Sequence, residues 1–235
     1  VQITENKFFP KNRRYLDSQK NIFYDLLIPE KNINNKSQNI ALNNKNPELN
    51  TKSFPSDFYS IKDIKTKKDK FIFAILPLIA SENQKILIKR NYLLNIQKSL
   101  NMNKTLNKND LSFLQTLALQ YKIDTKKTRK IDIINNLLEY VDVIPNSIVL
   151  AQAANESGWG TSRFAKDFNA LFGEYTYDIN NGIEPFLREE GKKHLVKFFP
   201  TISASIESYF NNINSHYAYD KFRKKRKMFR SNNIP

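Results

Sequence analysis

Residues 144–162 read IPNSIVLAQAANESGWGTS, and this stretch decides the fold. Pro145 suits the start of a helix, because its ring fixes φ and its missing N–H is not needed in the first turn. The residues that follow, 146–154, are apolar on almost every side, which predicts a buried central helix. That helix is expected to end in residues 155–160, where two glycines surround Trp159.

All five glycines of the chain lie between Gly158 and Gly191, together with its single tryptophan. Glycine is used where the backbone turns tightly or approaches another group closely. Inside this window, residues 172–177 and 194–199 have the composition of strands, with turn-forming residues between them. We therefore predict a small β-hairpin or meander inserted in a helical protein. A segment that is merely rich in turns is the alternative.

Apolar residues at spacings of three and four predict helices on both sides of this window. The ranges expected to be helical are 67–97, with a kink at Pro77, 111–121, after capping residues at 107–110, 131–140 and 203–213. The fold class predicted from these patterns is mainly α, with a small β element (α+β).

The first 52 residues differ in composition from the rest of the chain. Residues 31–52 are polar and rich in Asn, and such a stretch buries too little apolar surface to offset its ordering entropy. We expect a linker there, and a short docking helix or strand at 19–28. The predicted division is therefore a low-complexity segment and linker over 1–52, a helical part over 53–140, and a core with a basic tail over 141–235.

The charge balance reflects either selection for an anionic partner or a mutational bias toward Ile, Lys and Asn, and the electrostatic effect is the same in both cases. Lys and Arg number 38 against 23 Asp and Glu, a formal net charge of +15, which attracts nucleic acid, anionic membrane or acidic wall polymer. Seven of the ten residues Lys221–Arg230 are basic, and this tail is expected either to contact an anionic surface or to be a solvated helix end. The longest apolar run, 71–80, is too short to span a membrane.

Several kinds of chemistry are excluded by composition. The chain has no cysteine and only two histidines, His194 and His216, so thiolate nucleophiles and multi-histidine metal centres are ruled out. No metal and no cofactor is expected. Because the sequence starts at Val1, a leader peptide could precede it.

Glu156 is the candidate catalytic acid. Apolar surroundings and the negative end of a helix dipole are both expected to raise its pKa, as a glycosidic general acid requires. An exposed glutamate at a helix end is the alternative. A second carboxyl group should come from across a cleft, and the candidates are Glu174, Glu184, Glu189 and Glu190. Aromatic faces that could pack against sugars, or simply fill the core, are Tyr175, Tyr177, Tyr217 and Tyr219.

The stretch 144–162, followed by NALFG at 169–173, resembles the signature of glycoside hydrolase family 73, and of its Bax-type subgroup in particular. Further similar blocks occur at 67–79, 182–185, 188–191, 196–198, 205–209 and 214–223, so that the resemblance covers roughly 55–230. It implies a lysozyme-like helical domain with a small β-hairpin lobe beside a sugar cleft. The implied activity is that of a peptidoglycan hydrolase, an endo-β-N-acetylglucosaminidase that cleaves the β-1,4 bond after N-acetylglucosamine.

The resemblance also implies roles for individual residues. Glu156 is the general acid, and Glu189 is preferred over Glu184 and Glu190 as the second acid of the β-lobe. Substrate-binding roles are expected for Trp159, Phe172, Tyr175, Tyr217 and Tyr219. The route is either inverting, with a water held by the second carboxylate, or assisted by the 2-acetamido group of the substrate. A monomer in the cell envelope, periplasmic or exported, acting on peptidoglycan glycan strands, is the implied setting.

Two alternatives from other functional classes stay open. A wall-binding protein could keep the same groove and have lost turnover. A nucleic-acid binder would explain the basic charge, but the sequence contains no recognisable module of that kind.

Overall fold

The computed structural model describes residues 53–185, 191 and 193–232, so the linker expected at 31–52 and the short element expected at 19–28 lie outside the described residues. The helices are η2 (Ser56–Ser60), α2 (Ile64–Asn101), α3 (Lys108–Gln120), α4 (Lys130–Tyr140), α5 (Asn146–Glu156), α6 (Arg163–Phe168), α7 (Ile202–Ser215), η3 (Tyr217–Tyr219) and α8 (Asp220–Ser231). The strands are β1 (Tyr175–Thr176), β2 (Gly182–Ile183) and β3 (Leu195–Lys197). The prediction of a mainly α fold with a small β element is confirmed.

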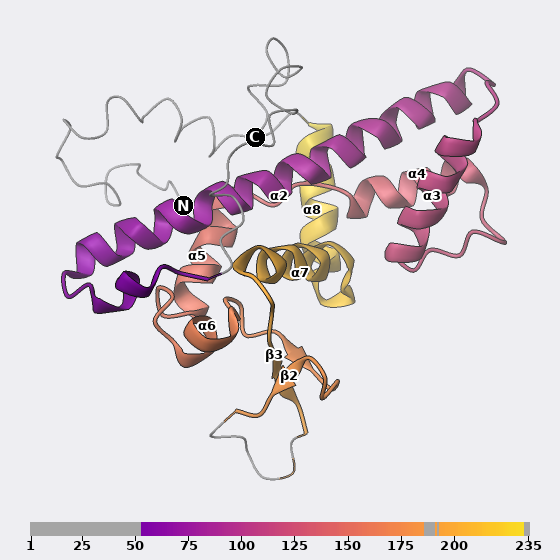
Figure 1. Ribbon diagram of the computed structural model, residues 1–235. Coiled ribbons are helices and arrows are strands. Elements are labelled where there is room, and N and C mark those ends of the chain that lie inside the picture. The colour runs from indigo at the N-terminus through magenta and orange to yellow at the C-terminus, as the bar shows by residue number, and fades with distance from the viewer. Residues whose placement is uncertain (1–52, 186–190, 192, 233–235) are drawn as a thin grey trace, which may run out of the picture.

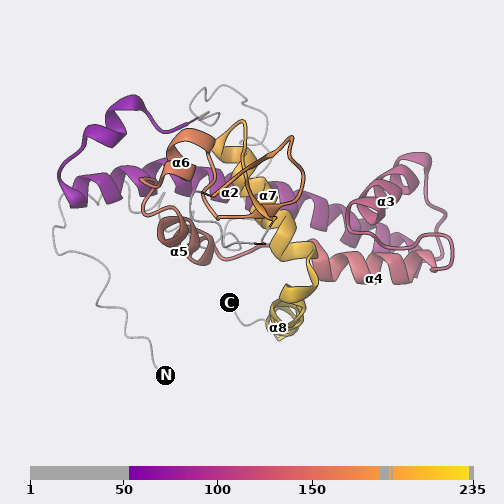
Figure 2. The ribbon, with the colours of Figure 1, turned by 90° about the horizontal axis from the view of Figure 1, so that it is seen from below.

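The long helix α2 forms the axis of the molecule. The Asp63 side chain caps its first turn by accepting from the Thr66 N–H at 2.8 Å, and the helix continues through Pro77 without a break. It packs against α4, α5 and α7. Figures 1 and 2 both show α5 and α6 near one end of α2, and α3 and α4 near the other.

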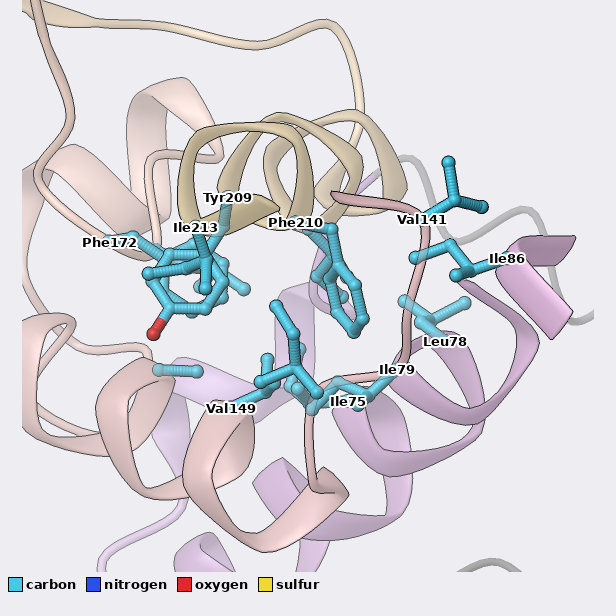
Figure 3. Close-up of a cluster of buried hydrophobic side chains, with 14 of the residues drawn as sticks. Ile75, Leu78, Ile79, Ile86, Val141, Val149, Phe172, Tyr209, Phe210 and Ile213 are labelled. Carbon is cyan, nitrogen blue, oxygen red and sulfur yellow. The ribbon is translucent and has the colours of Figure 1, made fainter. Parts of the chain in front are cut away.

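The central core lies where α2, α5 and α7 meet. Ile75 and Ile79 of α2, Val149 of α5 and Phe210 of α7 are all at most 1% exposed. Figure 3 shows these side chains pointing toward one another from the three helices. Burial of this apolar surface stabilises the fold and fixes α5 relative to α7.

The helix α2 also contains a window that is long and apolar enough to cross a membrane by length and composition. The sequence prediction considered only the uninterrupted run at 71–80 and missed this window. Half of the window is buried inside the protein, and a buried core helix meets the same test. The contacts with three other helices account for its apolar character.

A buried asparagine joins α2 to the start of α5. The Asn83 side chain donates to the Ile144 carbonyl and to Asn146 Oδ1, both at 2.7 Å, and accepts from the Ile144 N–H at 3.0 Å. All three residues are buried, so each bond satisfies a polar atom that water cannot reach. Asn83 therefore sets where α5 begins.

The basic tail forms the helix α8, one face of which packs against the rest of the protein. Arg226 of α8 donates to the carbonyls of Glu139, Asp142 and Val143, at and just beyond the end of α4, and to Asn214 Oδ1. Arg230 bonds the Asp142 carboxylate through two nitrogens, at 2.6 and 2.9 Å, and Arg223 donates to the carbonyls of residues 213 and 216. Three of the seven basic residues, the arginines, thus face the protein, and the expectation of a wholly solvated helix end is wrong.

The three short strands form the β-lobe. β3 lies in the middle and pairs antiparallel with both β1 and β2, so the spatial order is β1-β3-β2 rather than that of a meander. The segment of β2 was expected to be a turn. A Cβ at Gly182 would lie 2.6 Å from the side chains of both Leu195 and Thr176, so only glycine fits at this point of the lobe.

Candidate active site

A cleft of about 510 Å³ runs beside α5 and α7. One wall is formed by Ile144, Ile148, Gln152 and Glu156, and the other residues that line it are Phe172, Gly173, Glu174, Tyr209, Asn212, Ile213, Tyr219 and Phe222. The first set comes from α5 and the residues just before it, and the rest from the segment before β1, α7, η3 and α8. The cleft therefore lies where the β-lobe joins the helical part.

The helix α5 has two faces, which corrects the prediction that it is buried all round. Val149 and Ala153 are fully buried, whereas Ile148, Gln152 and Glu156 are exposed. The exposed residues recur every four positions, so they form one stripe along the helix. The sequence prediction treated the segment as a whole and did not separate this face, which lines the cleft.

Glu156 lies at the last position of α5 and lines the cleft. Its side chain is exposed, with the Asn155 amide donating to Oε1 at 3.3 Å, so the expected apolar surroundings are not found. Glu156 is therefore an exposed glutamate at a helix end, which is the alternative that the sequence analysis left open. The structure nevertheless directs this residue to the cleft.

Trp159 lies in the turn after α5 and outside the set of cleft-lining residues. Its φ of 57° is unusual for a bulky residue, and its neighbours Gly158 and Gly160 also have positive φ. The indole packs edge-on against Phe71 at 5.7 Å between ring centroids, and Lys68 Nζ lies 4.7 Å from the ring centroid. In this structure Trp159 anchors the turn to α2 rather than facing the cleft.

Glu174 is the buried carboxyl group of the cleft. Ser208 Oγ donates to its Oε2 at 3.1 Å, and Lys197 Nζ donates to the same Ser208 Oγ at 2.8 Å. Oε1 is buried and has no hydrogen-bond partner among the described residues. Burial raises the pKa of Glu174, while the Ser208 hydrogen bond and the Lys197 charge oppose that rise.

Tyr209 lies close to both acidic groups of the cleft. Its ring stacks on Phe172 with centroids 4.0 Å apart and planes 17° apart. Figure 3 shows the two side chains beside each other. Burial raises the pKa of Tyr209 to about 12, with further contributions from Tyr219, Glu174 and Glu156. Tyr209 and the two glutamates all line this cleft.

The remaining predicted site residues that the structure describes lie outside the cleft wall. Tyr175 and Tyr217 are 68% and 83% exposed and lie outside the lining residues, and each has its ring against a histidine, His194 and His216 respectively. Glu184 is exposed and also outside the lining. Glu189 and Glu190 lie outside the described residues.

Sequence reasoning did not single out four of the residues that line the cleft. These are Ile148, Gln152, Tyr209 and Asn212. The first two share the four-residue spacing of Glu156, and Tyr209 and Asn212 share one face of α7. That spacing was the available signal. Among the described residues no group of three or more His, Asp or Glu could hold a metal ion.

Two comparisons with known proteins point to the same family. Residues 131–233 match the glucosaminidase family model, described as mannosyl-glycoprotein endo-beta-N-acetylglucosaminidase. The chain is 36% identical over 165 residues to Protein bax of Escherichia coli (strain K12), an alignment that covers 70% of this chain and 57% of that protein. The chain therefore spans little more than half the length of this relative. No solved structure matches the chain.

Proposed function

Because the chain belongs to the Bax-type glucosaminidases, we propose that it is an endo-β-N-acetylglucosaminidase acting on peptidoglycan glycan strands. The bond cleaved is the β-1,4 bond after N-acetylglucosamine. The observation that carries the proposal is the position of Glu156, which ends α5 and lines a cleft together with Glu174, Tyr209 and Tyr219. A carboxyl acid with a second carboxyl group nearby is the arrangement that glycoside cleavage uses.

In the proposed reaction Glu156 gives its proton to the glycosidic oxygen as the bond to the anomeric carbon breaks. Either a water or the oxygen of the 2-acetamido group attacks that carbon from the other face. A second carboxyl group orients the attacking group. Glu189, the choice made from the sequence, remains a prediction.

The proposed setting is the cell envelope, where the glycan strands are found, with the protein acting as a monomer. The carboxylates of the stem peptides are an anionic partner for a chain of charge +15. In the tail, the exposed lysines are the groups left to contact an anionic surface, because the arginines bind the protein itself.

The test is digestion of purified sacculi by the wild type and by Glu156→Gln, with products reduced and identified by mass spectrometry. We expect fragments that end in reduced N-acetylglucosamine from the wild type and a loss of about 100-fold or more in the variant. Glu207→Gln makes the same chemical change at an exposed glutamate of α7 outside the cleft lining, so it is the matched control and should keep the activity. Fragments ending in reduced N-acetylmuramic acid would reassign the bond.

A wall-binding protein without turnover is the second candidate. The exposure of Glu156 favours it, because the apolar surroundings expected for the catalytic acid are not found. A pull-down with sacculi separates the two. Equal binding by wild type and Glu156→Gln, with no products from either, would support the binding protein.

A further inference from the structure

We propose that Glu174 is the second carboxyl group of this cleft, and that it accepts a hydrogen bond from the group that attacks the anomeric carbon. The inference rests on the proposed function and replaces the sequence-based choice of Glu189. Among the described candidates, Glu174 lines the cleft and Glu184 does not.

The backbone around Glu174 is held in place. The Lys197 N–H donates to the Glu174 carbonyl at 2.7 Å, which ties the segment before β1 to β3. The preceding residue, Gly173, has a φ of 58° and also lines the cleft. Glu174 therefore projects from a fixed point where the β-lobe meets the helical part.

The side chain is fixed at one oxygen and unpaired at the other. Lys197 and Ser208 form a hydrogen-bonded chain that ends on Oε2, whereas Oε1 is buried without a partner among the residues that the structure describes. A buried acceptor left unpaired costs free energy, and a ligand that supplies an N–H or O–H donor recovers it. Oε1 is thus an acceptor position for a donor brought by the substrate.

The environment also suits the chemistry. Burial raises the pKa of Glu174, and a base is most effective when its pKa lies near the working pH. The charged and titratable groups that interact with it are Lys197 of β3 and Tyr209 of α7, while Glu156 of α5 lines the same cleft. The cleft therefore holds one exposed carboxyl group, Glu156, and one largely buried carboxyl group, Glu174.

The donor can come from either of two sources. If water attacks, its oxygen bonds the anomeric carbon, one of its protons goes to Glu174, and the proton of Glu156 goes to the departing sugar oxygen. If the 2-acetamido oxygen attacks, Glu174 takes the acetamido proton as the ring of the intermediate closes, and water later opens that ring. The first route inverts the anomeric carbon and the second retains its configuration.

The experiment compares the wild type with Glu174→Gln, Ser208→Ala and Glu189→Gln. Glu207→Gln again serves as the matched control, because it changes a glutamate next to Ser208 that does not line the cleft. Rates of reducing-end release from sacculi, binding to sacculi and thermal unfolding are measured for each. Proton NMR of the first products identifies the anomer and hence the source of the attacking group.

We expect Glu174→Gln to lose about 100-fold or more in kcat while it still binds sacculi and stays folded, with Glu207→Gln unchanged. Ser208→Ala should shift the acidic limb of the kcat/KM profile to higher pH, because the lost hydrogen bond stabilised the ionised carboxylate. A purely structural role would leave that limb in place. The limb therefore tests the inference even if Glu174→Gln does not fold.

Two results overturn the inference. An active wild type with Glu174→Gln within about threefold of it, or an unmoved acidic limb in Ser208→Ala, overturns the assignment of Glu174 and leaves the proposed function standing. Loss of activity in Glu189→Gln alone would then return the role to that residue. A wild type that releases no reducing ends overturns the proposed function and the inference together.

Discussion

At the scale of the single residue, the buried carboxyl of Glu174 predicts a stability that depends on pH. Its pKa is raised in the folded protein above the ordinary value of 4.5, so the folded state binds the proton more tightly than the unfolded state. The stability that this provides is present below that value and is lost as the pH rises through the raised pKa. Glu174→Gln should therefore be more stable than the wild type at neutral pH.

The measurement is denaturant unfolding of both proteins between about pH 4 and pH 8. The difference in free energy of unfolding between Glu174→Gln and the wild type should disappear at about pH 4, because protonated glutamate resembles glutamine. Glu207→Gln, at an exposed position, should show no such difference. A pH-independent difference for Glu174→Gln would contradict the argument.

Gly160 gives a second prediction at this scale. Its φ is 76°, and a Cβ there would lie 2.9 Å from the ring of Phe54 and 3.2 Å from that of Phe71. Gly160→Ala should lower the free energy of unfolding by about 2–4 kcal/mol, since a strained backbone and overpacking add. Gly173→Ala is the control: its φ is 58° but nothing lies within 4 Å, so thermal unfolding should show a smaller loss.

Glu156 shows what the sequence could and could not predict at a site. Its place at the end of a helix followed from Pro145 at the start and the glycines after it, and α5 ends at Glu156. Its exposure could not be predicted from the sequence, because burial depends on which face of α5 packs against α2. The same dependence on tertiary packing made Glu174 one acidic candidate among four.

At the scale of the element, the exposed stripe of α5 predicts a role in binding. Ile148 is 44% exposed and lines the cleft two turns from Glu156, about 12 Å along the helix. Ile148→Asn should raise KM on sacculi about threefold to tenfold with little change in kcat, because apolar contact remote from the reacting bond is lost. Ser147→Asn, exposed but outside the cleft, should leave both constants unchanged.

The helix α8 is expected to contribute to the stability of the fold. Arg226 donates to the Val143 carbonyl just beyond α4 and to Asn214 Oδ1, so Arg226→Met removes the donor of these two acceptors. A loss of about 3 kcal/mol in the free energy of unfolding is expected. Lys221→Met removes an exposed charge of the same helix and should change stability by less than about 0.5 kcal/mol. Equal losses in both variants would mean that α8 does not dock through Arg226.

At the scale of the whole molecule, local patterns predicted the helices better than the β-lobe. The period of apolar residues predicted α4 and α7 almost to their ends, because each helix is a local structure. β2 was missed: it has two residues, and its pairing with β3 joins positions that are not neighbours in the chain. The inward-facing Arg226 of α8 was missed for the same reason, since its acceptors around the end of α4 lie more than 80 residues away along the chain.

The net charge of the chain predicts how binding to sacculi depends on ionic strength. Arg226 and Arg230 bind the protein itself, so the exposed lysines are the groups that attract an anionic polymer. Because these lysines are exposed, salt screens their attraction to the polymer. Raising the ionic strength from about 0.1 M to about 1 M shortens the screening length from about 10 Å to about 3 Å. KM on sacculi should then rise about tenfold while kcat stays constant. A neutral N-acetylglucosamine oligosaccharide, with no carboxylate to attract, should show no such rise, and a parallel rise on both substrates would show that salt acts on the cleft rather than on recognition of the polymer.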